Sequence, residues 1–424
     1  MSEWKRYKLG ELLRVKHGWA FKGEFFSDTG IQSILTPGNF YESGGFKANP
    51  SKDRFYCGDY PKEYLCSKGD LIVVMTEQAA GLLGSTAIVP EDNRYLHNQR
   101  IGLISCNESL NKDFAYYLFM TQSVRQQISR SASGTKVKHT SPEKIYDVQV
   151  DIPKIQTQKN IAIFLSSLDK KIQINNQIHQ ELEAMAKTLY DYWFVQFDFP
   201  DQNGKPYKSS GGKMVYHPEL KREIPEGWEV EKLGELIELE RGVTYAKSDI
   251  VEKTTKDAIG VLRATNITGN VMDLNDLVYL TKDKINNKQI IKQNETLIVM
   301  SSGSKEHLGK NAINYYEEVI GFGAFCSKIV PQKYSAFINT FLQSPEFKGY
   351  LLKQSMGTNI NNLTNSDILD CRIILPKEEI LDKFENMVEK NIRLISNNYI
   401  QNQELTQLRD WLLPMLMNGQ VKVE

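Results

Sequence analysis

The stretch WKRYKLGELL at residues 4–13 decides the organisation of the chain, because it returns as WEVEKLGELI at residues 228–237. Further matches follow in the same order, at shifts within a few residues of 224. They pair Leu71–Met75 with Leu297–Met300, Ser133–Val137 with Met356–Ile360, and Ile152-Pro153 with Leu375-Pro376. A period this long indicates two copies of a whole domain with its connector, and not a solenoid of short repeats.

Each copy has two parts of different character. The first part mixes short β-type runs with loops rich in Gly, Asn and Ser, which is typical of an irregular α/β domain. In the first copy these runs are Asp70–Met75, Ile101–Ser105 and Val148–Ile152. The second part follows a proline and contains neither Pro nor Gly over Lys154–Phe194 and again over Lys377–Leu413. Each such stretch predicts one helix, about 50–60 Å long at 1.5 Å per residue.

The apolar residues of these stretches recur in steps of three and four, which predicts a heptad seam. The first seam comprises Ile161, Leu165, Leu168, Ile172, Leu182, Ala186, Leu189 and Trp193, and the second comprises Phe384, Val388, Ile395, Leu405 and Leu412. Polar residues interrupt the seams at Asn175, His179, Asn391, Asn398 and Asn402. Either these residues fix the register between the two helices, or they mark a solvated seam centre.

The sequence therefore predicts an α+β chain in which two similar globular α/β domains alternate with two long helices. We expect the helices to pack as an antiparallel coiled-coil spacer with an internal pseudo-two-fold axis. The predicted parts are a first domain at 1–153, a first helix at 154–198, a linker with hairpin-like turns at 199–227, a second domain at 228–376, and a second helix with the C-terminal tail at 377–424.

Composition narrows the class of protein. The 424 residues carry 52 Lys+Arg and 52 Asp+Glu, so the formal net charge is zero, whereas a stand-alone nucleic-acid binder usually has a basic excess. The five cysteines are scattered and form no CxxC pair, which favours reduced thiols and disfavours disulfides or a zinc site. No secretory signal is apparent and the longest aliphatic run is Leu71–Met75, so we expect a cytoplasmic protein without membrane spans.

Familiar catalytic motifs are missing from the sequence. GSKEHLGKN at residues 303–311 has the wrong spacing for a phosphate-binding Walker A loop and ends in Asn where Ser or Thr would hold magnesium. Neither GxGxxG, GxSxG nor HExxH occurs, and no Asn/Asp-Pro-Pro-aromatic run is present. These absences favour a binding protein with no cofactor or metal of its own.

Five segments, in order, resemble the specificity subunit of type I restriction–modification systems. They are YKLGELLRVKHGWAFKGEFF at 7–26, HNQRIGLI at 97–104, VDIPKIQTQKNIAIFLSSLDKKI at 150–172, the junction WFVQFDFP…GKPYKSSGGKMV…REIPEGW within 193–228, and LRDWLLPMLMNGQVKV at 408–423. Together with the duplication, the resemblance covers almost the whole chain. One departure is Thr157, which stands where the family usually has Glu.

The resemblance implies that each globular domain recognises one half of a bipartite, asymmetric DNA sequence. The long helices would space these target-recognition domains and dock two modification (methyltransferase) subunits, and restriction (translocase/nuclease) subunits would complete the complex. The chain itself would be non-catalytic. S-adenosylmethionine, ATP and magnesium would then be bound by partner subunits, and base flipping would be theirs as well.

Candidate DNA contacts are polar and basic residues in loops, because Lys and Arg neutralise phosphates and Arg, Lys, Asn, Gln, Ser or Thr contact base edges. In the first domain they are Lys22, Asn98, Gln99, Arg100, Thr135, Lys136, Lys138 and His139. In the second they are Tyr245, Lys247, Arg263, Asn266, Ser302, Lys305, Thr358, Asn359 and Asn361. The segment 98–100 could instead hold the domain's own loops together, and the Gly-Thr loop near Thr135 could be a turn with a helix cap at Thr140 and Ser141.

Two alternatives from other functional classes remain open at this point. One is a coiled-coil adaptor whose globular ends bind proteins, and the other is an enzyme with an unfamiliar active site. The balanced charge predicts weak DNA binding by the chain alone, and strong, specific binding only in an assembled complex whose other subunits supply positive charge.

Overall fold

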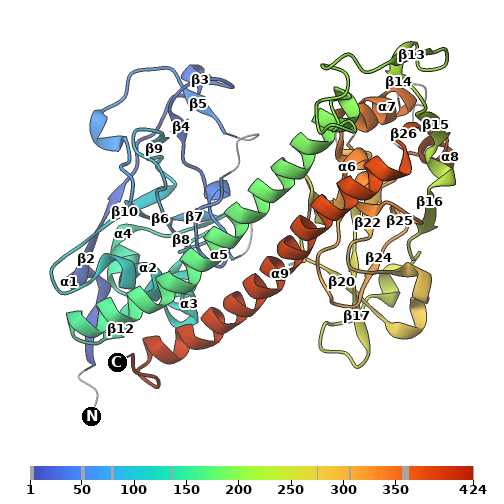
Figure 1. The fold of residues 1–424 in the computed structure, drawn as a ribbon. Coiled ribbons are helices and arrows are strands. Elements are labelled where there is room, and N and C mark those ends of the chain that lie inside the picture. Colours follow the sequence, from blue (N-terminus) through green and yellow to red (C-terminus); the bar gives the residue numbers. More distant parts are fainter. Residues whose placement is uncertain are drawn as a thin grey trace. The chain divides into compact units, whose positions relative to one another are not determined.

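The computed structural model describes residues 4–48, 53–77, 81–134, 137–274, 276–304, 307–355 and 362–423 (Figure 1). The chain divides into two compact units. The first unit comprises residues 1–172 and 404–424, and the second comprises residues 173–403. None of the helices in the described ranges is long and apolar enough to cross a membrane.

The first unit is built on an antiparallel sheet whose central strand is buried on both faces. The strand order is β2-β10-β6-β8, with bounds Leu13–His17, Ile101–Cys106, Leu71–Val74 and Thr86–Ile88. Strand β6 has the sequence LIVV and all four of its residues are buried, so the predicted strand at 70–75 is confirmed. Helices α2 (Lys112–Met120) and α3 (Gln122–Ser131) contribute to the same core, and Asn111 caps α2 by accepting a hydrogen bond of 2.9 Å from the Phe114 amide.

A second, smaller sheet and two strand pairs complete the first domain. The small sheet has the order β3-β5-β4-β9, with bounds Phe26–Ser27, Phe55–Tyr56, Ser33–Ile34 and Tyr95–Leu96. The pairs are β1 (Lys5–Lys8) with β12 (Gln149–Ile152) and β7 (Thr76–Glu77) with β11 (Lys138–His139). The short helices are α1 (Leu9–Leu12) and α4 (Pro142–Tyr146).

The second unit repeats the main sheet of the first and its pairing of the first and last strands, whereas the small sheet and the remaining strand pair differ in part. Its main sheet has the order β16-β25-β22-β23, with bounds Ile237–Arg241, Cys326–Pro331, Thr296–Val299 and Asn311–Ile313. Its small sheet has the order β20-β17-β24-β21, with bounds Val278–Thr281, Ala258–Leu262, Ile320–Phe322 and Ile290–Ile291. The strand pairs are β15 (Glu229–Lys232) with β26 (Arg372–Leu375) and β18 (Ile267–Thr268) with β19 (Val271–Met272). The helices are α6 (Ser335–Gln343), α7 (Pro345–Ser355) and α8 (Asn365–Leu369). Strands of the main sheet begin 224 or 225 residues after their counterparts, so the predicted duplication is confirmed.

The two predicted long helices are present. Helix α5 spans Ile155–Tyr190 and continues as a π-helical turn over Asp191–Val195, and helix α9 spans Glu378–Met417. In each unit a segment of α5 pairs with a segment of α9 in antiparallel order. In the first unit Arg409 Nη1 lies 2.9 Å from Asp169 Oδ1, and in the second unit the early half of α9 packs on the late half of α5. The α+β fold class and the antiparallel pairing are therefore confirmed, and the internal two-fold axis stays a prediction.

Asn175 decides between the two interpretations of the polar seam positions. Its side chain is 1% exposed, and its Nδ2 donates to Gln401 Oε1 at 2.8 Å and to Asn402 Oδ1 at 2.9 Å. Asn402 donates in turn to Asn176 Oδ1 at 2.8 Å. A buried amide with partners on the facing helix favours one register, because a slip would leave it unpaired in an apolar seam.

The linker between the copies is ordered by aromatic stacking. The ring of Phe199 stacks on Trp228 at 4.8 Å and on Tyr207 at 4.6 Å between centroids. Beyond it, β13 (Met214–His217) and β14 (Arg222–Pro225) form an antiparallel hairpin. The hairpin-like turns expected between residues 199 and 227 are thus confirmed.

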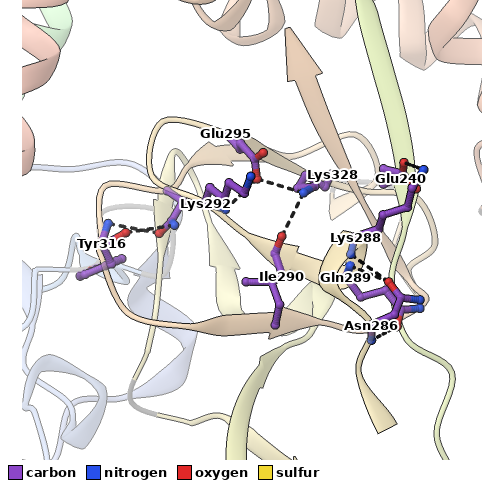
Figure 2. Close-up of polar contacts among 10 residues, drawn as sticks. Glu240, Asn286, Lys288, Gln289, Ile290, Lys292, Glu295, Tyr316 and Lys328 are labelled. Atoms are coloured by element: carbon purple, nitrogen blue, oxygen red, sulfur yellow. Dashed lines mark hydrogen bonds and ion pairs between the residues drawn. The ribbon is translucent and has the colours of Figure 1, made fainter. Parts of the chain in front are cut away.

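One central strand of the second unit carries a buried lysine. Lys328 on β25 is 4% exposed; its Nζ lies 3.1 Å from Glu295 Oε2 and donates to the Ile290 carbonyl at 2.9 Å (Figure 2). The equivalent position of β10, 225 residues earlier, is Leu103. The strands of the two main sheets are therefore paired in the same register, but one equivalent position is the neutral Leu103 in one sheet and the charged Lys328 in the other.

Candidate nucleic-acid interface

Backbone hydrogen bonds bring the predicted loops of the first domain together. The Trp19 amide donates to the His97 carbonyl at 2.8 Å, and the Gln99 amide donates to the Trp19 carbonyl at 3.1 Å. The loop that follows β2, which contains Lys22, is thereby fixed against residues 98–100. Lys22, Gln99 and Arg100 are exposed, and Asn98 is half-buried.

A glycine permits this close approach in both domains. A Cβ atom on Gly18 would collide with the carbonyl oxygen of Asn98, and one on Gly242 would collide with the carbonyl oxygen of Gly323. The two glycines are 224 residues apart, and each follows the last residue of its strand, β2 or β16. The contact between these two loops is therefore a built part of the duplicated fold.

Strand pairing brings the segment that follows the Gly-Thr loop of the first domain next to residues 98–100. The Met75 amide donates to the Arg100 carbonyl, and the Thr140 amide donates to the Met75 carbonyl, both at 2.9 Å. The pairing of β7 with β11 leaves Lys138 and His139 exposed beside this junction. Thr135 and Lys136 lie outside the described residues.

Both interpretations of that loop find support in its local contacts. Ser141 Oγ caps α4 by accepting from the Lys144 amide at 3.5 Å, so the expected helix cap exists and Ser141 provides it. Thr140 is buried and does not cap the helix. His139 Nδ1 lies 3.0 Å from Thr76 Oγ1, which orients the imidazole at the surface.

A buried histidine supports the segment 98–100 from below. The Nε2 atom of His97 lies 2.9 Å from the Ile101 carbonyl oxygen, which closes the turn. Burial lowers the pKa of His97 to about 4, so the ring is neutral near pH 7. His97 therefore holds the turn beneath residues 98–100, while the side chains of Gln99 and Arg100 are exposed at the surface.

The second domain assembles its loops in the same way. The Val243 amide donates to the Phe322 carbonyl at 2.8 Å, and the Ala324 amide donates to the Val243 carbonyl at 2.9 Å. The Met300 amide donates to the Phe325 carbonyl at 2.8 Å, and the Leu363 amide donates to the Met300 carbonyl at 2.7 Å. These bonds place three segments side by side, namely 243–247, 300–302 and 323–325.

The predicted residues of the second domain fall into three groups. Tyr245, Lys247 and Ser302 lie on the clustered segments, and Ser302 is half-buried. Four further predicted residues lie outside the described residues, namely Lys305, Thr358, Asn359 and Asn361. Arg263 and Asn266 belong to a different loop.

Asn266 requires a correction. It is 2% exposed; its Oδ1 accepts from the Arg263 amide at 2.8 Å, and its Nδ2 donates to the Asp276 carbonyl at 2.9 Å. Arg263 Nη2 pairs with Asp276 Oδ2 at 2.7 Å. These groups are used in holding their own loop, so we withdraw Asn266 from the DNA-contact set and regard Arg263 as a loop-ordering residue.

The internal repeat could have indicated that Asn266 orders its own loop. Asn39 occupies the corresponding loop of the first domain, in LTPGN against LRATN, and its Oδ1 accepts from the Thr36 amide at 2.8 Å. Asn39 is buried as well. An asparagine that recurs at the same loop position in two domains whose other loop residues differ is expected to hold the loop in its conformation.

Sequence reasoning missed two exposed residues of the second cluster. Phe325 is 65% exposed and lies 225 positions after Arg100. Arg241 is exposed at the end of β16 and lines a recess of about 380 Å³ together with Ser301, Phe325 and Asn362. Applying the repeat shift to Arg100 would have singled out Phe325.

The fold and these loops define a duplicated recognition protein with one loop cluster on each of two equivalent domains. The family model of the type I restriction modification DNA specificity domain matches residues 1–184 and 225–405. The chain belongs to this family. It is a non-catalytic DNA-specificity subunit with two target-recognition domains, and this result favours the DNA-recognition interpretation over the adaptor and enzyme alternatives.

Similar proteins cover nearly the whole chain. The chain is 26% identical over 357 residues to the type I restriction enzyme MjaIX specificity subunit of Methanocaldococcus jannaschii, covering 83% of this chain and 78% of that protein. It is 24% identical to the HindI specificity subunit of Haemophilus influenzae, covering 99% of this chain and 100% of that one. The crystal structure of the type I restriction–modification S subunit from M. genitalium shares the fold, with a TM-score of 0.54 at 15% identity, over 98% of this chain and 96% of that chain.

Proposed function

We propose that each target-recognition domain binds one half of a bipartite DNA sequence through its loop cluster. The observation that carries this proposal is that equivalent loops converge in both domains through equivalent backbone bonds, while the exposed side chains differ. A common frame with different side chains suits two half-sites of different sequence. The target is therefore asymmetric.

Phosphate and base contacts divide naturally among the exposed residues. Lys22, Lys138 and Lys247 carry flexible charges suited to phosphate oxygens, whereas Gln99 and Arg100 offer planar donors suited to base edges. The predicted interface also includes six residues that lie outside the described ranges, namely Thr135, Lys136, Lys305, Thr358, Asn359 and Asn361.

The long helices space the two domains and dock two modification subunits. Helices of 36 and 40 residues are about 54 and 60 Å long, which suits a spacer. They also leave large apolar side chains exposed, as expected of a surface that binds protein. These are Ile163, Ile174, Met185, Met387, Leu394 and Trp411.

The complete complex acts in the cytoplasm on double-stranded DNA. Modification subunits supply S-adenosylmethionine-dependent methylation of adenine, and restriction subunits supply ATP- and magnesium-dependent translocation and cleavage. The zero net charge of this chain supports a division of labour in which partner subunits provide most of the phosphate neutralisation.

Single-molecule methylome sequencing of the host with and without this gene tests the proposal. We expect deletion to remove methyladenine from one bipartite, asymmetric motif and from no other. In parallel, the chain together with its modification subunit should retain a duplex that carries the motif at physiological salt, and the chain alone should not. Failure of that assembly to retain any duplex even at low salt would contradict the proposal.

A further inference from the structure

The turn between β24 and β25 presents a large apolar side chain at the centre of the second loop cluster. Phe325 is 65% exposed and lines a recess together with polar groups, among them Arg241, Ser301 and Asn362, and with the apolar side chains of Met300 and Leu363. Isolated exposed apolar residues are common on protein surfaces. This one differs because it occupies the position that Arg100 holds in the first cluster.

The backbone on both sides of Phe325 is firmly held. The Cys326 amide donates to the Gly323 carbonyl and the Ala324 amide donates to the Val243 carbonyl, both at 2.9 Å. The Phe325 carbonyl accepts from the Met300 amide at 2.8 Å. The ring is therefore exposed on a fixed turn, which suits contact with a partner at a defined position.

DNA offers few apolar groups at its base edges. In the major groove, the 5-methyl group of thymine is the apolar feature that distinguishes one base from the others. We propose that Phe325 is a specificity-determining residue of the second target-recognition domain and that its ring packs on the 5-methyl group of a thymine in the second half-site. This inference rests on the proposed function. The neighbouring Arg241 and Asn362 then contact polar edges next to that thymine.

Deoxyuridine substitution tests the contact, because deoxyuridine keeps the base pairing of thymidine and lacks only the 5-methyl group. Binding of the assembled complex is measured on duplexes in which each thymine of the motif is replaced in turn. For the unaltered chain, we expect one position in the second half-site where the replacement weakens binding roughly four-fold, the effect of burying one methyl group. In Phe325→Ala that penalty should vanish, and in Phe325→Leu it should persist in part.

Matched controls separate this contact from general loss of structure. Val319 is 64% exposed just before β24, outside the loop cluster, so Val319→Ala should leave both the affinity and the deoxyuridine penalty unchanged. Penalties in the first half-site should be the same in all variants. Thermal melting of each variant checks that the second unit is folded.

Three results would overturn the inference while leaving the proposed function intact. The first is an equal deoxyuridine penalty in Phe325→Ala and in the unaltered chain. The second is a second half-site that contains no thymine on either strand. The third is loss of DNA bending in Phe325→Ala without any deoxyuridine effect, which would indicate that the ring inserts between base pairs. If the unaltered complex binds no specific duplex, the proposed function itself fails.

Discussion

The two target-recognition domains share the same main-chain hydrogen bonds around their loops. They differ in the side chains at equivalent positions, both on the surface and inside the sheet. At equivalent positions the first has His97, Arg100 and Leu103, and the second has Phe322, Phe325 and Lys328. The backbone bonds around these positions correspond in the two domains. The comparison teaches that the main chain fixes the loops, whereas the side chains are free to diverge, both at the surface and within the sheet.

The largest expected effect on stability concerns the buried Lys328, which stands where the first domain has Leu103. Glu295→Ala removes the carboxylate that lies 3.1 Å from buried Lys328, so we expect the second unit to lose about 3 kcal/mol or more of unfolding free energy. The double change Lys328→Leu with Glu295→Ala should recover most of this loss, because Leu103 shows that the equivalent strand accepts leucine. Urea unfolding of the full chain measures both.

The control for that experiment is an exposed pair on the same unit. Lys288 and Glu240 are 2.6 Å apart, and the lysine side chain is largely exposed (Figure 2). Lys288→Ala should therefore leave the free energy of unfolding nearly unchanged. A Glu295→Ala cost as small as this control would contradict the importance of burial.

The second effect is a pH dependence of the stability of the first unit, which contains His97 where the second unit has Phe322. The pKa of His97 is lowered to about 4 by burial, from 6.5 in the unfolded chain, so between these values the unfolded state binds more protons. Stability of the first unit should therefore fall as pH falls from 6.5 towards 4, by up to about 3 kcal/mol. Unfolding midpoints across that range measure the slope.

The variant His97→Phe installs the residue of the second domain, Phe322, at this position. Whatever its stability at pH 7, the slope between pH 6.5 and 4 should become shallower than in the unaltered chain. An unchanged slope would assign the acid sensitivity to another group.

A third comparison concerns the helix pairs. In the second unit, the neutral amide of Asn175 joins the two helix segments through hydrogen bonds. In the first unit, the segments are joined by the ion pair of Arg409 with Asp169. The Oδ2 atom of Asp169 also accepts a hydrogen bond from the Tyr117 hydroxyl at 2.5 Å. Asn175→Ala should cost about 1–2 kcal/mol at any salt concentration, because it leaves facing amides unpaired. Arg409→Gln should cost a similar amount at low salt and only slightly less at high salt, because the pair is partly buried and salt screens such pairs weakly. Melting at two ionic strengths measures both costs.

The smallest effect is expected at the phosphate contacts. Lys22→Ala and Lys247→Ala, on equivalent loops, should each weaken binding of the assembled complex to all duplexes alike and reduce the dependence of log K on log salt by about one. Titrations on the motif and on a scrambled duplex test this expectation. A loss confined to the motif would instead make that lysine a base contact.

The sequence predicted the architecture better than the interface. The 224-residue repeat and the Pro- and Gly-free stretches located both domains and both helices, because hydrophobic periodicity and chain breakers are local properties. Asn266 was misassigned because its burial depends on a carbonyl ten residues away, at Asp276, which no local pattern shows. A rule that assigns DNA contacts to polar residues does not select Phe325, and its exposure follows from long-range backbone pairing, which the sequence does not show.

The glycines at 18 and 242 have a consequence for evolution. Each lets two loops meet through main-chain atoms, so this one contact requires no side chain from the exposed loop residues. Mutations at the loop tips can then change the recognised bases without first having to preserve a folding contact. A protein of this design can acquire new DNA targets by single substitutions, one half-site at a time.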